Sequence, residues 1–318
     1  MKLSFLCMSL LVLIGGSLCL GSVNLFDPSM SGSLVKDILV NLRVPRTLAA
    51  AMTGGVLGIS GAVLQGFLRN PLADASLLGI GAGSALFAVI AINLGGTVCG
   101  FSTVPFSAVM GSIVTVILLY QFLRDSYSPL RLVLVGVALN SLFGALTSLA
   151  LSLSENPYAI MQVLFWLFGS YADIPLTQVL LSFPFVSLGF WLLWSLGPLL
   201  DALSFGEDMA KIMGFSLKRG YLKLIGGVGL TVGISVALCG IVGFIGLVIP
   251  HIMRRFFGAK PSHIFIPSCI GGALLSLLAD MIVRIVPSHI EIKVGVMTSL
   301  MGAPFFIYLL YRSYRAEI

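Results

Sequence analysis

Two arginines, Arg43 and Arg46, stand at the edge of the long uncharged run 47–68. A guanidinium can bind a carboxylate through two parallel hydrogen bonds, so such a pair can hold an acidic partner in a fixed orientation. The chemistry that these residues suggest is recognition of carboxylates. A third arginine, Arg284, follows Asp280 by one helical turn and could pair with that local carboxylate instead.

Residues for catalysis or metal binding do not gather in any recognisable motif. The three histidines, His251, His263 and His289, lie in different boundary regions without the spacing of metal ligands. No Gly-Lys dipeptide occurs in the sequence, which excludes a P-loop and ATP hydrolysis through one. We therefore predict no catalytic residue, no metal site and no cofactor bound by this chain.

The composition indicates a protein that lies within a membrane. The 318 residues are 58% hydrophobic and only 9% charged, and the mean hydropathy is +1.08. Soluble domains carry roughly 25% charged residues. We therefore predict an all-α polytopic membrane protein with a single transmembrane domain over residues 1–318. Basic residues at the membrane boundaries explain the net charge of +6 without a nucleic-acid partner.

Ten apolar stretches are candidate membrane spans, since a spanning helix needs about 20 apolar residues. They are 3–22, 47–68, 75–94, 105–123, 132–153, 176–197, 222–239, 241–256, 264–283 and 294–311. Glycines and Pro250 interrupt the seventh and eighth stretches, which we expect to be two short or broken helices. A further apolar stretch, 156–172, is slightly short, and we expect it to be interfacial or re-entrant.

The distribution of basic residues predicts the orientation of these spans. With the N-terminus inside, most of the 18 lysines and arginines lie on the inner side. The positive-inside rule then places both termini in the cytoplasm. Only five basic residues fall on the outer side: Lys36, Arg43, Arg46, Arg284 and Lys293. Arg43 and Arg46 run against the bias directly beside a span, which indicates a function for them.

The segment 201–223 is the only substantial stretch predicted to lie in the cytoplasm. Charged and apolar residues alternate along it, and Gly206 and Gly214 bracket one short amphipathic helix. Such a helix could lie on lipid headgroups or dock into a cytoplasmic partner. At another inner boundary, Pro71 disfavours the α conformation at Asn70 and so breaks the helix there.

Several motifs together resemble the FecCD family, the permeases of ABC importers for iron-siderophores, heme and cobalamin. The resemblance runs in order from about residue 40 to residue 312. It rests on Arg43–Ala49, Ser60–Gln65, Arg69–Asp74, Gly243–His251, Leu278–Asp280, Gly295–Thr298 and Gly302–Phe306.

The resemblance implies a fold, a location and a set of partners. The fold is that of a type II ABC importer permease with about ten helices, in the bacterial inner membrane. The expected partners are a second permease subunit (identical or a paralogue), two cytoplasmic ATPase subunits that hold ATP and Mg, and a periplasmic or lipid-anchored binding protein. The implied mechanism is alternating access driven by ATP.

The resemblance also implies roles for particular residues. Arg43, Arg46 and Arg284 match the arginines that receive glutamates of the binding protein. Asn70 and Leu72 match a first cytoplasmic gate, and a second gate falls near Ser128 and Pro129, where Ser-Pro replaces the polar pair of the family. The segment that couples to the ATPase matches Gly206, Glu207, Asp208, Ala210, Lys211, Met213, Gly214 and Leu217.

The cargo and one rival function stay open at this point. A ferric siderophore is the first expectation, because it is the commonest cargo of the family, and heme and cobalamin follow. The main alternative is a secondary transporter of a small solute that works without partners. It would need ionisable residues at mid-membrane, and Asp280 is the nearest to one. An intramembrane enzyme lacks paired catalytic residues within the spans, and a scaffold would leave the arginines unexplained.

Overall fold

The computed structural model describes residues 2–21, 31–95, 97–98, 101–124, 127–286 and 292–316, so His289 lies outside the described residues. Two short strands, β1 (Thr97–Val98) and β2 (Phe101–Ser102), pair antiparallel. The helical elements are α1 (Lys2–Cys19), α2 (Gly32–Ile38), the π-helical turn η1 (Leu39–Arg43), α3 (Val44–Phe67), the 3-10 turn η2 (Ala75–Leu78), α4 (Ile80–Asn93), α5 (Val104–Leu123), α6 (Pro129–Ser152), α7 (Pro157–Leu167), α8 (Leu176–Trp194), α9 (Gly197–Leu203), α10 (Glu207–Ile212), α11 (Leu217–Cys239), α12 (Ile245–Phe257), α13 (Pro261–Ile285) and α14 (Val294–Ala316).

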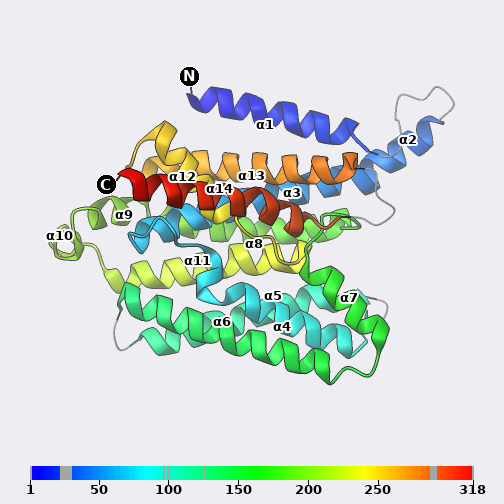
Figure 1. The fold of residues 1–318 in the computed structure, drawn as a ribbon, viewed down its shortest axis with the longest axis horizontal. Helices are drawn as coiled ribbons and strands as arrows, with labels where there is room; N and C mark the ends of the chain where they lie inside the picture. Colours follow the sequence, from blue (N-terminus) through cyan, green and yellow to red (C-terminus); the bar gives the residue numbers. More distant parts are fainter. Residues whose placement is uncertain are drawn as a thin grey trace.

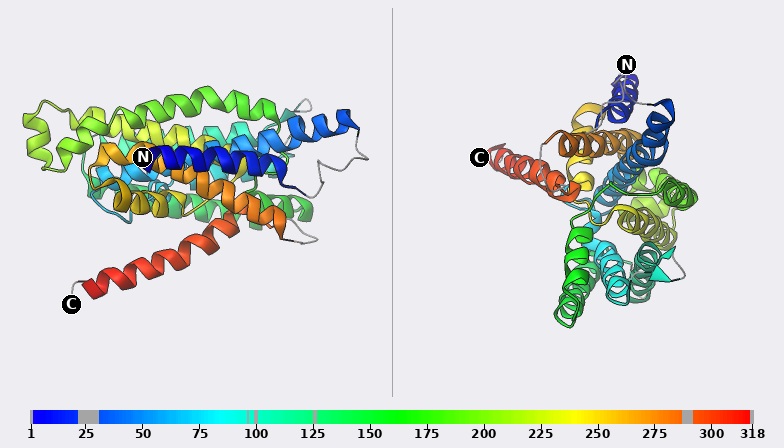
Figure 2. Two further views of the ribbon diagram at one scale, coloured as in Figure 1. Left: turned by 90° about the horizontal axis from the view of Figure 1, so that it is seen from above. Right: turned by 90° about the vertical axis from the view of Figure 1, so that its right-hand side faces the viewer.

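The long helices run side by side along the longest axis of the molecule (Figure 1). Both chain ends and α10 lie at one end of this bundle, and α2 and α7 lie at the opposite end (Figure 1). We name these the α10 end and the α2 end. In both views of Figure 2, α8 and α14 lie on opposite flanks of the bundle.

The helices confirm the predicted fold class. Each of the ten predicted spans contains a helix: α1, α3, α4, α5, α6, α8, α11, α12, α13 or α14. Within the described residues, seven helical segments are long and apolar enough to cross a membrane. Over the same residues, two other apolar helices are shorter: α4, and α14 over the range Val294–Ile307. The apolar stretch 156–172 contains α7, which has 11 residues. An α-helix rises 1.5 Å per residue, so α7 is about 16 Å long and too short to cross.

The stretch predicted as two short helices is instead one long helix followed by one short helix. α11 has 23 residues and is long enough to cross, and α12 has only 13. The prediction began α11 too late because Lys218 and Arg219 were assigned to the cytoplasmic segment before the span. Ser216 caps the helix start, where its side chain accepts a hydrogen bond from the backbone N–H of Arg219.

Arg43 and Arg46 lie within a helix, although the sequence had placed them just before one. α2, η1 and α3 form one continuous helical segment, Gly32–Phe67. The π-helical turn ends at Arg43, two residues before Pro45. Proline has no N–H to donate, and its ring clashes with the carbonyl four residues earlier. A π turn widens the backbone at that point, so the helix continues past the proline.

Glycines allow α3 to pack closely against two other helices. Gly54 and Gly58 face the backbone of Gly272 and Ser268 on α13, and Gly61 faces the backbone of Gly246 on α12. Small residues at such contacts let helices approach closely in a lipid environment. These contacts hold α3 at the centre of the bundle, with most of its side chains buried.

We expect Gly61→Ala to destabilise the protein by about 1–3 kcal/mol, as overpacking does elsewhere. The added Cβ would overlap the backbone carbonyl of Gly246, so α3 and α12 would have to separate. A lower melting temperature, followed by tryptophan fluorescence in detergent, would show this loss. The control is Gly15→Ala on α1, because nothing lies within 4 Å of the added Cβ there. Equal melting temperatures for the two variants would contradict the close contact.

Candidate functional site

Two of the three predicted docking arginines converge on one buried carboxylate near the α2 end. Nε of Arg46 donates a hydrogen bond to Oδ1 of Asp280 at 2.9 Å, and Nη2 of Arg46 lies 2.8 Å from the same oxygen. Nη2 of Arg284 contacts the other oxygen, Oδ2. The Asp280 side chain is fully buried, while those of Arg46 and Arg284 are 19% and 7% exposed. The local pair between Arg284 and Asp280 that the sequence suggested is therefore present.

Arg43 and Arg284 also bind the end of α1. Nη1 of Arg43 donates to the carbonyl oxygens of Leu18 at 2.9 Å and Cys19 at 2.6 Å. Nη1 of Arg284 donates to the carbonyl oxygen of Ser17 at 2.9 Å. The last carbonyls of a helix have no partner within the helix and favour a positive charge. These two arginines therefore attach α1 to η1 and to α13.

The predicted coupling residues lie in and around α10, a short helix that projects from the α10 end (Figure 1). Glu207, Asp208, Ala210 and Lys211 are in α10, Gly206, Met213 and Gly214 flank it, and Leu217 begins α11. Gly206 and Gly214 have φ angles of 118° and 85°, which favour glycine, and they separate α10 from its neighbours. Ala210 is buried, and its carbonyl accepts a hydrogen bond from the N–H of Phe215 at 3.0 Å. Asp208 and Lys211 form an exposed ion pair at 3.2 Å.

Exposed apolar side chains lie in and beside α10, next to the exposed charges of Asp208 and Lys211, and the predicted residue set included only some of them. The exposed side chains include Met213, which was predicted, and Phe205 and Ile212, which were not. The amphipathic alternation of the segment was the available signal, but it does not say which apolar side chains turn inward. The exposed apolar side chains can bind an apolar groove on a partner, as amphipathic helices do.

An aspartate that the sequence gave no reason to select anchors the base of this segment. Asp201 in α9 accepts hydrogen bonds from the backbone N–H of Ser262 at 3.1 Å and from the Ser262 hydroxyl at 2.7 Å. Lys260 pairs with the same carboxylate at 3.4 Å. Asp201 therefore caps the start of α13, 61 residues further along the chain, and ties α9 to that helix.

The two predicted gate segments lie at the ends of α3 and α6. Asn70 folds into a local turn, because its side-chain oxygen accepts a hydrogen bond from the N–H of Leu72 at 2.9 Å. Leu72 is exposed. Ser128 and Pro129 begin α6, where the Ser128 carbonyl accepts a hydrogen bond from the N–H of Leu132 at 3.0 Å.

Tyr221, near the start of α11, lies between the chain segments that lead into both gates. Its ring is 4.7 Å from the ring of Phe67 (edge-on) and 5.5 Å from the ring of Tyr127, measured between centroids. Phe67 is the last residue of α3, before the turn at Asn70, and Tyr127 directly precedes Ser128. The sequence gave no signal for this cluster, because it joins three separate parts of the chain.

Ligands for a metal ion do not assemble among the residues that the structure describes. No group of three or more His, Cys, Asp or Glu side chains lies close enough to hold one there. The site chemistry that can be described therefore consists of ion pairs, helix caps and apolar contact surfaces.

Sequence and structure comparisons agree on one family. Residues 5–312 match the FecCD transport family. The chain is 36% identical over 300 residues to the uncharacterized ABC transporter permease protein YvrB of Bacillus subtilis, covering 93% of this chain and 83% of that protein. It is 35% identical over 315 residues to the vitamin B12 import system permease protein BtuC of Citrobacter koseri, covering 98% and 94%.

A solved structure shares the fold over the whole chain. It is described as a metal-chelate type ABC transporter in an inward-facing conformation. The two structures superpose with a TM-score of 0.89 and 32% sequence identity, and the match covers 98% of this chain and 99% of that chain. The family match, the identity to both permeases and the shared fold lead to one conclusion. This chain is a multi-pass membrane protein that belongs to the FecCD transport family of ABC importer permeases.

Proposed function

We propose that this chain is the permease subunit of a binding-protein-dependent importer that moves a bulky metal chelate by ATP-driven alternating access. A ferric siderophore is our first choice of cargo, and heme and cobalamin are the alternatives. The names of the relatives support this class of cargo, since one is named a vitamin B12 import system permease and another is described as a metal-chelate type ABC transporter. The observation that carries the proposal is the set of exposed apolar side chains in and beside α10, Phe205, Met209, Ile212 and Met213.

ATPase subunits would bind at the α10 end, which we propose to be cytoplasmic along with both termini. α10 would seat in a partner, and its movement would reach the gates through the anchored base of α9 and through Tyr221. Tyr221 suits this role because its ring contacts the residues that lead into both gates. The hydrogen bond accepted by the Ala210 carbonyl and those accepted by Asp201 would hold the segment in place during this movement.

A second permease subunit would pack against α6, with the pathway between the two copies. An exposed face of α6 carries Ser141, Gly144, Ser148 and Ser152 at helical spacing. The hydroxyls of Ser148 and Ser152 donate to carbonyls one turn earlier in the same helix. Such a face is polar enough to line a pathway, yet offers few groups that would hold a passing chelate tightly.

Docking of a binding protein would take place at the α2 end, close to Arg46. Of the two guanidiniums bound to Asp280, that of Arg46 is the more exposed. Arg43 and Arg284 would support the docking surface from beneath by holding α1 in place. Glutamates of a binding protein would then compete with, or add to, the contact between Arg46 and Asp280.

The geometry around Asp280 disfavours the secondary transporter. A carboxylate that couples transport to protons or sodium ions must release its partner in each cycle. Asp280 is buried and is bound by two guanidiniums, so its carboxylate is poorly placed to exchange either a proton or a sodium ion. No specific observation favours the rival function.

The test is purification of the tagged chain from its native membrane in mild detergent, with mass spectrometry of the proteins that co-elute. We expect an ABC ATPase subunit in the eluate. Any binding protein found with it would be assayed for ferric siderophore, heme or cobalamin. Repeated elution of the chain without an ATPase would overturn the proposal and favour a transporter that works alone.

A further inference from the structure

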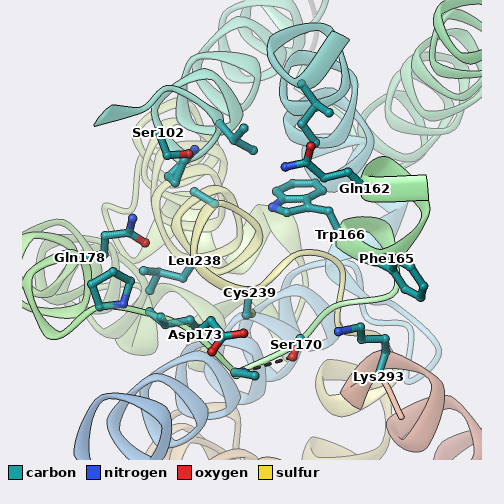
Figure 3. Close-up of a pocket in the computed structure, with 17 residues that line it drawn as sticks. Ser102, Gln162, Phe165, Trp166, Ser170, Asp173, Gln178, Leu238, Cys239 and Lys293 are labelled. Atoms are coloured by element: carbon teal, nitrogen blue, oxygen red, sulfur yellow. Dashed lines mark hydrogen bonds between the residues drawn. The ribbon is translucent and has the colours of Figure 1, made fainter. Parts of the chain in front are cut away.

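Two adjoining cavities near the α2 end differ in chemistry. The first, of about 560 Å³, is lined by a mixture of polar, aromatic and aliphatic side chains near several helix ends (Figure 3). The second, of about 610 Å³, is lined almost entirely by apolar side chains of α5, α8 and α11. The cavities share Pro105, Gln178, Ala237 and Leu238. Together they form a depression that is polar at the end of the bundle and apolar along its side.

The apolar cavity is a groove on the flank of the bundle. Its lining runs along α5 from Pro105 to Ile117. At 1.5 Å per residue this is about 18 Å. The hydrocarbon core of a bilayer is about 30 Å thick, so the groove is about as long as one leaflet is deep. Exposed lining residues such as Leu181 and Phe185 leave it open on the α8 flank, opposite α14 (Figure 2).

The polar cavity lies where a headgroup would lie for a chain in that groove. It adjoins the first residues of α5 and α8 and the last residues of α11, where these long apolar helices begin or end. Asp173 and Lys293 contribute one negative and one positive charge, and Gln162 and Gln178 add amides (Figure 3). Nζ of Lys293 lies 5.6 Å from the ring centroid of Phe165. Two opposite charges that line one cavity complement a ligand that carries both signs.

We propose that these cavities bind one phospholipid with a zwitterionic, primary-amine headgroup from the leaflet at the α2 end. One acyl chain occupies the α5–α8–α11 groove. The phosphate lies beside Lys293, and the ammonium group lies beside Asp173. An ordinary annular lipid needs only the apolar flank, whereas this site also selects the headgroup through two opposite charges.

The test uses the full chain in nanodiscs of dioleoyl phosphatidylethanolamine and dioleoyl phosphatidylglycerol in equal amounts. The protein is extracted again in mild detergent, and retained lipids are counted by native mass spectrometry. We expect one phosphatidylethanolamine per chain. Leu181→Trp should lower its retention about tenfold or more by filling the groove, because lipid affinity scales with buried methylene groups. Leu180→Trp is the control. The side chains of Leu180 and Leu181 are 59% and 72% exposed, but only Leu181 lines the groove.

A second variant pair tests the headgroup. Asp173→Asn removes the negative charge, and asparagine accepts the left-handed backbone at this position, where φ is 57°. Retention should shift from phosphatidylethanolamine toward phosphatidylglycerol. Asp37→Asn, an exposed carboxylate on α2, should change nothing. Equal retention in the two tryptophan variants, or wild-type retention that simply follows the supplied lipid ratio, would overturn the proposal. The readout is independent of transport and of any ATPase.

Discussion

Replacing Asp280 with alanine is expected to lower the free energy of unfolding by about 3–5 kcal/mol, the usual loss when one partner of a buried ion pair is removed. Two guanidiniums, those of Arg46 and Arg284, would lose the carboxylate that they share. Neither guanidinium can become fully hydrated, because both arginine side chains are largely buried. The loss would appear as a large fall in melting temperature in detergent and as a broadened peak in size-exclusion chromatography.

The matched control is Asp208→Ala, which removes a carboxylate from an exposed ion pair with Lys211. Exposed pairs contribute only about 0–1 kcal/mol, so its melting temperature should stay close to that of the wild type. Asp280→Asn separates charge from size: it keeps the volume and still leaves the arginines without a counter-charge. If Asp280→Ala melted at the same temperature as Asp208→Ala, the buried ion pairs would not be part of the folded state.

If α10 docks into an ATPase subunit as proposed, changing Ile212 to glutamate should release that subunit while leaving the fold intact. Ile212 is 77% exposed at the tip of the bundle, so burial against a partner would be its main contact. A charge buried in an apolar groove without a counter-ion is costly, and central apolar residues of an interface often contribute 2 kcal/mol or more. Co-purification of the ATPase should therefore fall by about thirtyfold or more at fixed subunit concentrations.

The control for this change is Leu94→Glu, because Leu94 is 83% exposed but follows α4, away from the α10 segment. Both variants should keep the wild-type melting temperature, since neither side chain is buried. Loss of the ATPase in Ile212→Glu alone would support the α10 surface as the contact. Normal co-purification in Ile212→Glu would move the contact away from α10, and loss in both variants would point to a general defect.

Local patterns in the sequence predicted much of the fold. Apolar runs located the ten helices, because a helix in lipid must bury its backbone groups within itself and present apolar side chains. Gly206 and Gly214 located α10, because positive φ angles at its ends favour glycine. Helix boundaries were predicted less accurately than helix positions. Lys218 and Arg219 lie inside α11, although their charge indicated a loop. A helix can extend past the membrane boundary, and hydropathy does not show where it ends.

The candidate site was only partly predictable, because its residues meet across long distances in the chain. Arg46 and Asp280 are 234 positions apart, and Asp201 and Ser262 are 61 apart. Nothing local to Arg43 indicates that it binds carbonyls at the end of α1. The docking role expected for Arg43, Arg46 and Arg284 stays a prediction. A test that substitutes these arginines must also measure folding, because the same substitutions remove contacts within the chain.

The sequence by itself determined that this protein lies in a membrane, that ten apolar stretches along it form helices and that it belongs to the FecCD family. Those properties depend on composition, on apolar periodicity and on short motifs, all of which are local. Only the tertiary structure decided that Asp280 joins two arginines, that Gly61 meets Gly246 and that two cavities adjoin beside α5. Such contacts follow from how the helices pack, and packing depends on the shapes of many side chains at once.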